Sequence, residues 1–322
     1  MRILVTGGTG FIGRHILPAL ARDGHSLRIL HRDPRQGEAL AAHGEPFLGD
    51  LGDVERLVFA AEGMEAVVHA AGVIRGNAER DFQRGNAGTA SRLACACRAA
   101  GTIRRIVHLS SLSAFGPAPG NAVPDESDSP APISPYGRSK LAAERALDEG
   151  CGGIPVLHLR LTAVYGPGDR ETLALFRMAA RGAFFIPGGA ERRIQMLFVA
   201  DAVEAARAAL ATGPAGPYFI AHPRVLTYSD LSLALGQAIG RRVAVLPVPA
   251  LVVSLLGVAS QGLGALARRP TMFNAGKARE MLAAAWLCSP EKARTMLRFS
   301  CLTDFPEGAQ RTFLWYREHH WL

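Results

Sequence analysis

The sequence is poor in cysteine and has no paired cysteine motif. Its five cysteines are odd in number, and none stands in the C-x2-C spacing typical of a zinc or thiol-redox site. We therefore expect no metal site and a reducing, cytoplasmic location. The five are Cys95, Cys97, Cys151, Cys288 and Cys301.

A signal peptide and a basic arm are also missing. Only three consecutive apolar residues, Ile3 to Val5, precede Thr6-Gly7, too few for the core of a signal peptide. The 36 Lys and Arg residues exceed the 28 Asp and Glu residues, giving a net charge of +8, but they are scattered along the chain. This pattern argues against nucleic-acid binding and permits attraction to a phosphorylated cofactor.

One long apolar segment covers residues 247–267 and is followed by Arg268-Arg269. It is interrupted by Ser, Gln and Gly residues, which make it a poor membrane-spanning helix. We interpret it as a buried helix or one that lines a substrate cavity. Contact with a membrane surface is the alternative.

The first half of the chain alternates short apolar runs with helical patterns. With 322 residues, 48% of them hydrophobic, the chain can bury a large core. The alternation predicts right-handed βαβ units, and so an α/β protein with a Rossmann-type, doubly wound parallel sheet. We predict a dinucleotide-binding domain over residues 1–166, to which residues 195–222 return, and a smaller, mostly helical substrate-binding region over 167–322.

A glycine-rich loop follows the first predicted strand and opens a helix. It reads Thr6-Gly7-Gly8-Thr9-Gly10-Phe11-Ile12-Gly13. Its glycines allow a tight turn, a close approach to a pyrophosphate and close packing of the helix, whose first N–H groups face the phosphates. We expect Gly7, Gly10, Phe11, Ile12 and Gly13 to bind the cofactor.

The residues after the second strand bear on which dinucleotide binds. An acidic residue there would favour NAD, whereas this chain has His31-Arg32. Arg32 could pair with a 2′-phosphate, so NADP(H) is predicted and NAD is the alternative. Asp33 precedes Pro34, a pattern typical of a helix cap that occupies the carboxylate.

Tyr136 and Lys140 lie four residues apart in a predicted helix, and so on one helix face. The ammonium, with an oxidised nicotinamide, would lower the pKa of the phenol from about 10 toward the working pH. A phenol so tuned can exchange a proton with a carbonyl or an alcohol. Ser111 leaves a strand end and could hydrogen-bond the substrate oxygen. His108 and His158 lie inside apolar strand patterns, and we expect neither metal nor base roles for them.

These motifs together resemble the extended short-chain dehydrogenase/reductases, which include NAD-dependent epimerases and dehydratases, 3β-hydroxysteroid dehydrogenases and dihydroflavonol reductases. The resemblance implies that Ser111, Tyr136 and Lys140 are catalytic, and the interval of 25 positions from Ser111 to Tyr136 is similar to the family's. It also implies cofactor contacts from Asp50 and Leu51, and from Ala70, Ala71 and Gly72. Asn86-Ala87-Gly88-Thr89 resembles the N-x-x-G-T motif with one residue fewer before the glycine.

Two departures from the family bear on the substrate. Ala163 stands where nucleotide-sugar enzymes usually carry Asn, and Arg192 and Arg193 are displaced from the position of their Arg. The apolar segment from Pro247 onward, with Met272 and Phe273, indicates a hydrophobic substrate, although plain core packing would give the same pattern.

We therefore predict an NAD(P)-dependent oxidoreductase that transfers a hydride between nicotinamide and a carbonyl or secondary alcohol of a small apolar substrate. The alternatives are a nucleotide-sugar epimerase or dehydratase with tightly bound NAD, and a non-catalytic nucleotide-binding accessory subunit. The resemblance also implies a homodimer.

Overall fold

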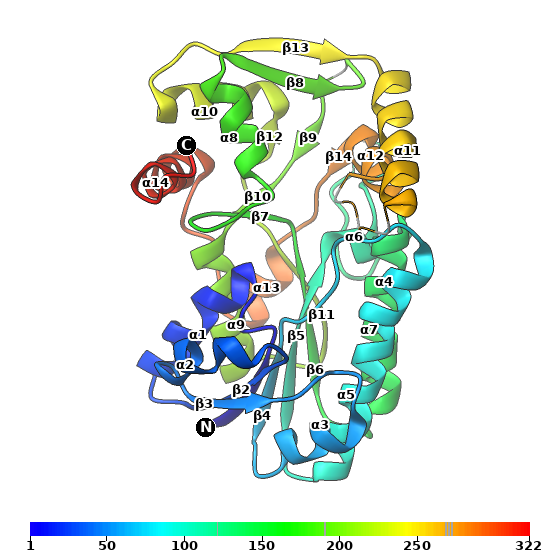
Figure 1. The fold of residues 1–322 in the computed structure, drawn as a ribbon, viewed down its shortest axis with the longest axis vertical. Coiled ribbons are helices and arrows are strands. Elements are labelled where there is room, and N and C mark those ends of the chain that lie inside the picture. Colours follow the sequence, from blue (N-terminus) through cyan, green and yellow to red (C-terminus); the bar gives the residue numbers. More distant parts are fainter. Residues whose placement is uncertain (121, 190, 268, 270, 272) are drawn as a thin grey trace.

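The computed structural model describes residues 1–120, 122–189, 191–267, 269, 271 and 273–322. Its centre is a sheet of seven strands in the order β11-β6-β5-β4-β1-β2-β3 (Figure 1). Every neighbouring pair in this sheet is parallel, which confirms the predicted Rossmann-type fold. The strands are β1 (Arg2–Thr6), β2 (Ser26–His31), β3 (Glu45–Leu48), β4 (Ala66–His69), β5 (Arg105–Ser111), β6 (Val156–Leu161) and β11 (Gly216–Ile220).

Helices cover both faces of this sheet, so its central strands are buried and read as continuous apolar runs. One hydrophobic core joins α1 (Phe11–Arg22) and α9 (Val199–Ala211) to the sheet. The other face packs against α3 (Val54–Ala61), α5 (Ala87–Ala100) and α7 (Pro135–Gly150). Shorter helices complete this part of the chain: η1 (Pro34–Gln36), α2 (Gly37–Ala41), α4 (Glu79–Gly85) and α6 (Leu112–Phe115).

The strand order places the functional edge of the sheet. The chain runs from β1 outward to β3 and then returns to β4 on the other side of β1. Loops after β1 and β4 therefore diverge at the carboxyl edge and leave a crevice, where parallel sheets bind ligands.

The second region lies beyond that carboxyl edge, at the top of Figure 1. It has its own core, built around α8 (Leu173–Ala180), α10 (Tyr228–Ile239) and α14 (Phe305–Glu318). It also contains α11 (Ala250–Leu266), α12 (Ala275–Leu282) and α13 (Glu291–Met296). Between the helices lie short strands that the sequence patterns did not predict: β7 (Ala163–Tyr165), β8 (Ala183–Pro187), β9 (Arg193–Ile194), β10 (Met196–Phe198), β12 (Leu226–Thr227), β13 (Ala244–Val248) and β14 (Ala285–Trp286).

The apolar segment 247–267 forms the end of β13 and nearly all of α11. The expectation that it is a buried helix is wrong for most of its length, because only Val253, Gly257 and Gly264 of α11 are buried. Small residues form the buried face, so the larger apolar residues are left outside. Met272, which we assigned to the same apolar surface, lies outside the described residues. Within the described ranges no helix is long and apolar enough to cross a membrane.

Candidate active site

The glycine loop after β1 has the shape that a dinucleotide requires. Gly7 has a φ of +75°, and a Cβ there would lie 2.4 Å from the backbone N of Ala71. A Cβ on Gly13 would lie 2.1 Å from the carbonyl oxygen of Gly7. Side chains are thus excluded from both positions, and α1 begins with unpaired backbone N–H groups and no acidic residue in its first turn. These features fit the pyrophosphate of NAD or NADP.

The turn after β2 presents an exposed cation. Arg32 is exposed, and no hydrogen bond or ion pair joins it to any described residue. Asp33 caps η1 by accepting a hydrogen bond from the backbone N of Arg35, and it pairs with the Arg35 guanidinium at 2.9 Å. The predicted capping role of Asp33 is confirmed, so its carboxylate is not free for a ribose.

Asp50 and Leu51 follow β3 and so lie at the same carboxyl edge. The Asp50 carboxylate is exposed and accepts a hydrogen bond of 2.6 Å from the backbone N of Gly52. The carbonyl of Leu51 accepts a hydrogen bond of 2.7 Å from Arg92 on α5. Both residues hold the turn beside the predicted adenine site.

Ser111 and Tyr136 meet across the crevice. Ser111 ends β5 and Tyr136 lies in the first turn of α7, and their side chains share a hydrogen bond. Burial raises the pKa of Tyr136 to about 12, while the Ser111 hydrogen bond opposes this and the nearby Glu280 adds to it. The direction is opposite to the lowering that the sequence predicted. At neutral pH the phenol is therefore protonated and ready to donate.

Lys140 explains this difference, because its ammonium is held away from the phenol by two acceptors on β5. Its Nζ donates to the carbonyl oxygen of Leu109 at 2.7 Å and contacts Nε2 of His108 at 3.1 Å. Lys140 is buried, and burial lowers its pKa from 10.5 to about 8, which Glu144 partly offsets. One of its three N–H donors remains available for a ligand.

His108 and His158 form a polar chain inside the sheet, which could not be assembled from sequence patterns alone. Nδ1 of His108 lies 3.0 Å from Nδ1 of His158, and Nε2 of His158 lies 2.9 Å from a carboxylate oxygen of Asp148. Burial lowers the pKa of His108, assisted by the Lys140 ammonium. Both histidines are buried, whereas Asp148 is exposed on α7.

Two further contacts fix the catalytic helix against its surroundings. Asn86, the first residue of the N-x-x-G-T-like motif, donates to Oγ of Ser139 at 2.8 Å and also bonds the backbone of Val73. Ser134 caps α7 and donates to Glu280 of α12 at 2.6 Å. The loop after β4 and the second region are thereby both tied to the helix that carries Tyr136.

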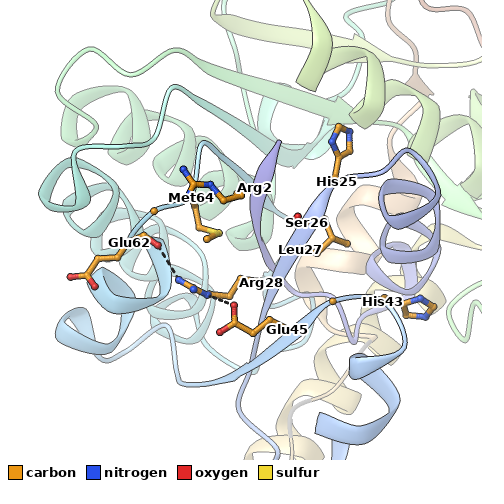
Figure 2. Close-up of a pocket in the computed structure, with 11 residues that line it drawn as sticks. Arg2, His25, Ser26, Leu27, Arg28, His43, Glu45, Glu62 and Met64 are labelled. Carbon is orange, nitrogen blue, oxygen red and sulfur yellow. Dashed lines mark hydrogen bonds and ion pairs between the residues drawn. The ribbon is translucent and has the colours of Figure 1, made fainter.

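A depression at the opposite edge of the sheet is a poor candidate for the active site. Figure 2 shows it lined by residues at the amino ends of the strands, among them Arg2, Ser26 and Glu45. Its central Arg28 pairs with Glu45 at 2.8 Å and donates to three carbonyls at the end of α3. Arg28 is thus fully engaged in structure, and the chemistry lies at the carboxyl edge instead.

Comparison with known proteins agrees with this site. The model of the NAD-dependent epimerase/dehydratase family matches residues 3–221. The chain is 32% identical to the ceramide reductase of Caulobacter vibrioides, over 99% of this chain and 96% of that protein. It is 31% identical to the 2-alkyl-3-oxoalkanoate reductase of Stenotrophomonas maltophilia, over 74% and 76% of the two chains.

Among solved structures, MoeE5 in complex with UDP-glucose and NAD superposes with a TM-score of 0.80 and 25% identity. The match covers 99% of this chain and 100% of that one. The relatives thus comprise reductases and sugar-nucleotide enzymes. The predicted NAD(P)-dependent oxidoreductase is supported by the former, and the epimerase alternative stays open through the latter. The chain belongs to the NAD-dependent epimerase/dehydratase family of extended short-chain dehydrogenase/reductases.

Proposed function

We propose that this protein is an NADP(H)-dependent reductase that converts a ketone on a long-chain, lipid-like molecule to a secondary alcohol. The observation that carries the proposal is the near full-length similarity to a ceramide reductase, together with the set Ser111, Tyr136 and Lys140. Ala163 supports it as well, because the side chain that nucleotide-sugar enzymes use at this position is missing.

The residues of the site would divide the reaction as follows. Ser111 donates a hydrogen bond to the substrate carbonyl oxygen, and Tyr136 Oη gives its proton to that oxygen as the alcohol forms. A bound nicotinamide supplies the hydride. Lys140 returns a proton to the phenolate, and its remaining N–H binds the cofactor. The raised pKa of Tyr136 suits a residue that must arrive protonated.

The preference for NADP(H) rests on Arg32. It is exposed beside the predicted ribose site, and the neighbouring Asp33 is occupied by Arg35. A 2′-phosphate would gain a charged partner there, whereas NAD would lack an acidic residue for its ribose hydroxyls.

Turnover of NADPH with a series of ketones of increasing chain length tests the proposal. We expect kcat/KM to rise with chain length, since each methylene buried in an apolar site contributes about 0.8 kcal/mol. UDP-glucose would be the control substrate. Interconversion of UDP-sugars without net NADPH oxidation would instead establish the epimerase alternative.

We also propose a cytoplasmic homodimer. The five cysteines of the chain are free in the structure, as a reducing compartment would keep them. The family resemblance supports pairing through the outer faces of α5 and α7. Sedimentation equilibrium of the purified chain measures this directly, and a mass of one chain would contradict it.

A further inference from the structure

The outer face of α11 is covered with exposed leucines. Five of them are more than half exposed: Leu251 (69%), Leu255 (59%), Leu256 (56%), Leu263 (68%) and Leu266 (84%). They recur at spacings of three to four residues, so they form a continuous apolar stripe along a helix that is about 25 Å long. An apolar stripe of this size on a water-soluble surface marks an interaction site.

The packing of α11 fixes this stripe outward. A Cβ on Gly257 would lie 2.7 Å from the Cβ of Ala278, and one on Gly264 would lie 2.3 Å from Cγ2 of Thr271. The inner face of the helix therefore admits only small residues. Rotation of α11 would push leucines into these contacts, so the helix cannot bury them against its own protein.

The strand that leads into α11 continues the apolar surface. Leu246 of β13 and Phe185 of β8 are register partners in a parallel pair, so their side chains point to the same face of the ribbon. Both are 42% exposed. Figure 1 shows α11 along the outer margin of the second region, directly after β13.

The charge around this surface selects its partner. Residues 241–279 contain no Asp or Glu and six basic residues: Arg241, Arg242, Arg268, Arg269, Lys277 and Arg279. A second copy of the chain docked here would set like charges against one another, whereas anionic lipid headgroups would complement them. The combination of exposed leucines and a basic, acid-free surround is typical of helices that lie in a membrane interface.

We propose that α11, together with Leu246 and Phe185, docks flat on the surface of an anionic phospholipid bilayer. The docking stands on this surface alone, and its purpose rests on the proposed function. α12, against which α11 packs, contacts the start of the catalytic helix, where Glu280 accepts a hydrogen bond from Ser134. A lipid-like ketone leaving the bilayer at α11 would thus meet Tyr136 one helix away.

Flotation of the full chain with vesicles tests this proposal. We expect binding to vesicles of phosphatidylglycerol and phosphatidylethanolamine, and weak binding to vesicles of phosphatidylcholine. The double variant Leu255→Glu with Leu263→Glu should lower the affinity at least about tenfold. Leu302→Glu is the matched control, because Leu302 is 85% exposed but lies outside α11, and it should bind like the wild type.

Turnover of a short, water-soluble ketone separates this proposal from the proposed function. The double variant should keep that turnover while losing the vesicles, and a protein that binds vesicles but reduces no ketone would refute only the proposed function. Equal loss of binding in Leu302→Glu would overturn the docking, as would failure of the wild type to bind. A wild-type dimer that the double variant dissociates would show instead that a second copy covers α11.

A second inference, carried by different contacts, concerns the buried chain from Lys140 to Asp148. Its hydrogen bonds allow one arrangement of protons while Lys140 is charged. The ammonium can only donate, so Nε2 of His108 accepts and the proton of His108 sits on Nδ1. Nδ1 of His158 must then accept, which places its proton on Nε2, facing the Asp148 carboxylate.

We infer that Asp148 and His158 are positioning residues that hold His108 in the tautomer able to accept a hydrogen bond from Lys140. A donor at position 148 would reverse the chain, so that Nε2 of His108 carried a proton toward the ammonium. The other groups facing Lys140 and His108 lie on other elements or turns and would stay in place: His69, which stacks on His108 at 5.3 Å, and Glu144.

NMR of the resting protein tests this without any substrate. The chain has only three lysines, Lys140, Lys277 and Lys292, so a carbon-13 label on lysine resolves the titration of Lys140. Asp148→Arg should lower the pKa of Lys140 by about one unit, because its protonated form loses an acceptor. Nitrogen-15 shifts of the histidines should show the reversed tautomers.

Two controls separate tautomer from charge. Asp148→Asn keeps an acceptor oxygen and should leave the pKa of Lys140 near the wild-type value. Glu149→Arg makes the same charge change one residue further along the exposed face of α7 and should also leave it there. An equal shift in Glu149→Arg, or unchanged tautomers in Asp148→Arg, would overturn the inference whether or not the protein reduces ketones.

Discussion

Replacing Lys140 by Met should change how the stability of the protein depends on pH. In the folded protein the pKa of Lys140 falls from 10.5 to about 8 through burial. Between these values the unfolded chain holds a proton that the folded one has released, so the free energy of unfolding rises with pH. The contribution is fully present above 10.5 and is lost as the pH falls through about 8.

The magnitude follows from the size of the pKa change. Each unit corresponds to 1.36 kcal/mol, so the wild type should gain about 3 kcal/mol relative to Lys140→Met between about pH 7 and about pH 10.5. Interactions that Met cannot make, such as the 2.7 Å hydrogen bond to Leu109, shift the whole difference without changing its slope.

Urea unfolding of both proteins without cofactor, at several pH values across this range, measures the difference. Lys277→Met is the matched control, because its ammonium is largely exposed and should give no comparable slope. A wild-type minus Lys140→Met difference that stays flat from about pH 7 to about pH 10.5 would refute the assignment of Lys140 as a buried cation with a depressed pKa.

Three further substitutions test other parts of the site. Tyr136→Phe should keep cofactor binding and lower kcat at least about a hundredfold, as loss of a general acid does; near-normal kcat would remove Tyr136 from the mechanism. Arg32→Ala should raise the KM for NADPH by about tenfold or more and leave that for NADH unchanged, as measured by initial rates. Arg160→Met should destabilise the protein by about 3–5 kcal/mol in urea unfolding, because it leaves Glu144 buried without its 2.7 Å ion pair. A destabilisation below about 1 kcal/mol would contradict that reasoning.

The features predicted well from the sequence are those determined by neighbours along the chain. The glycine loop, the Asp33 cap and the helical spacing of Tyr136 and Lys140 each depend on a few consecutive residues, and the structure contains all three. The pairing of Ser111 with Tyr136 was also predicted, because strand ends of a parallel sheet meet at one edge.

The features that sequence patterns missed depend on contacts between distant segments. The pKa of Tyr136 rises rather than falls because Lys140 bonds β5, which helical spacing alone does not reveal. His108 and His158 were expected to be inert, yet register pairing of β5 with β6 sets them side by side. Hydropathy suggested burial for α11, but its glycines decide which face packs, and they turn its leucines outward.

The central claim is that this protein reduces ketones with a cofactor it exchanges at each turnover. The most direct test is to denature freshly purified protein, quantify any released dinucleotide, and measure whether the native protein exchanges it with added NADPH. We predict an empty or freely exchanging site that prefers NADPH over NADH. Tightly held NAD⁺ near one per chain that does not exchange would contradict the account and favour an epimerase or dehydratase.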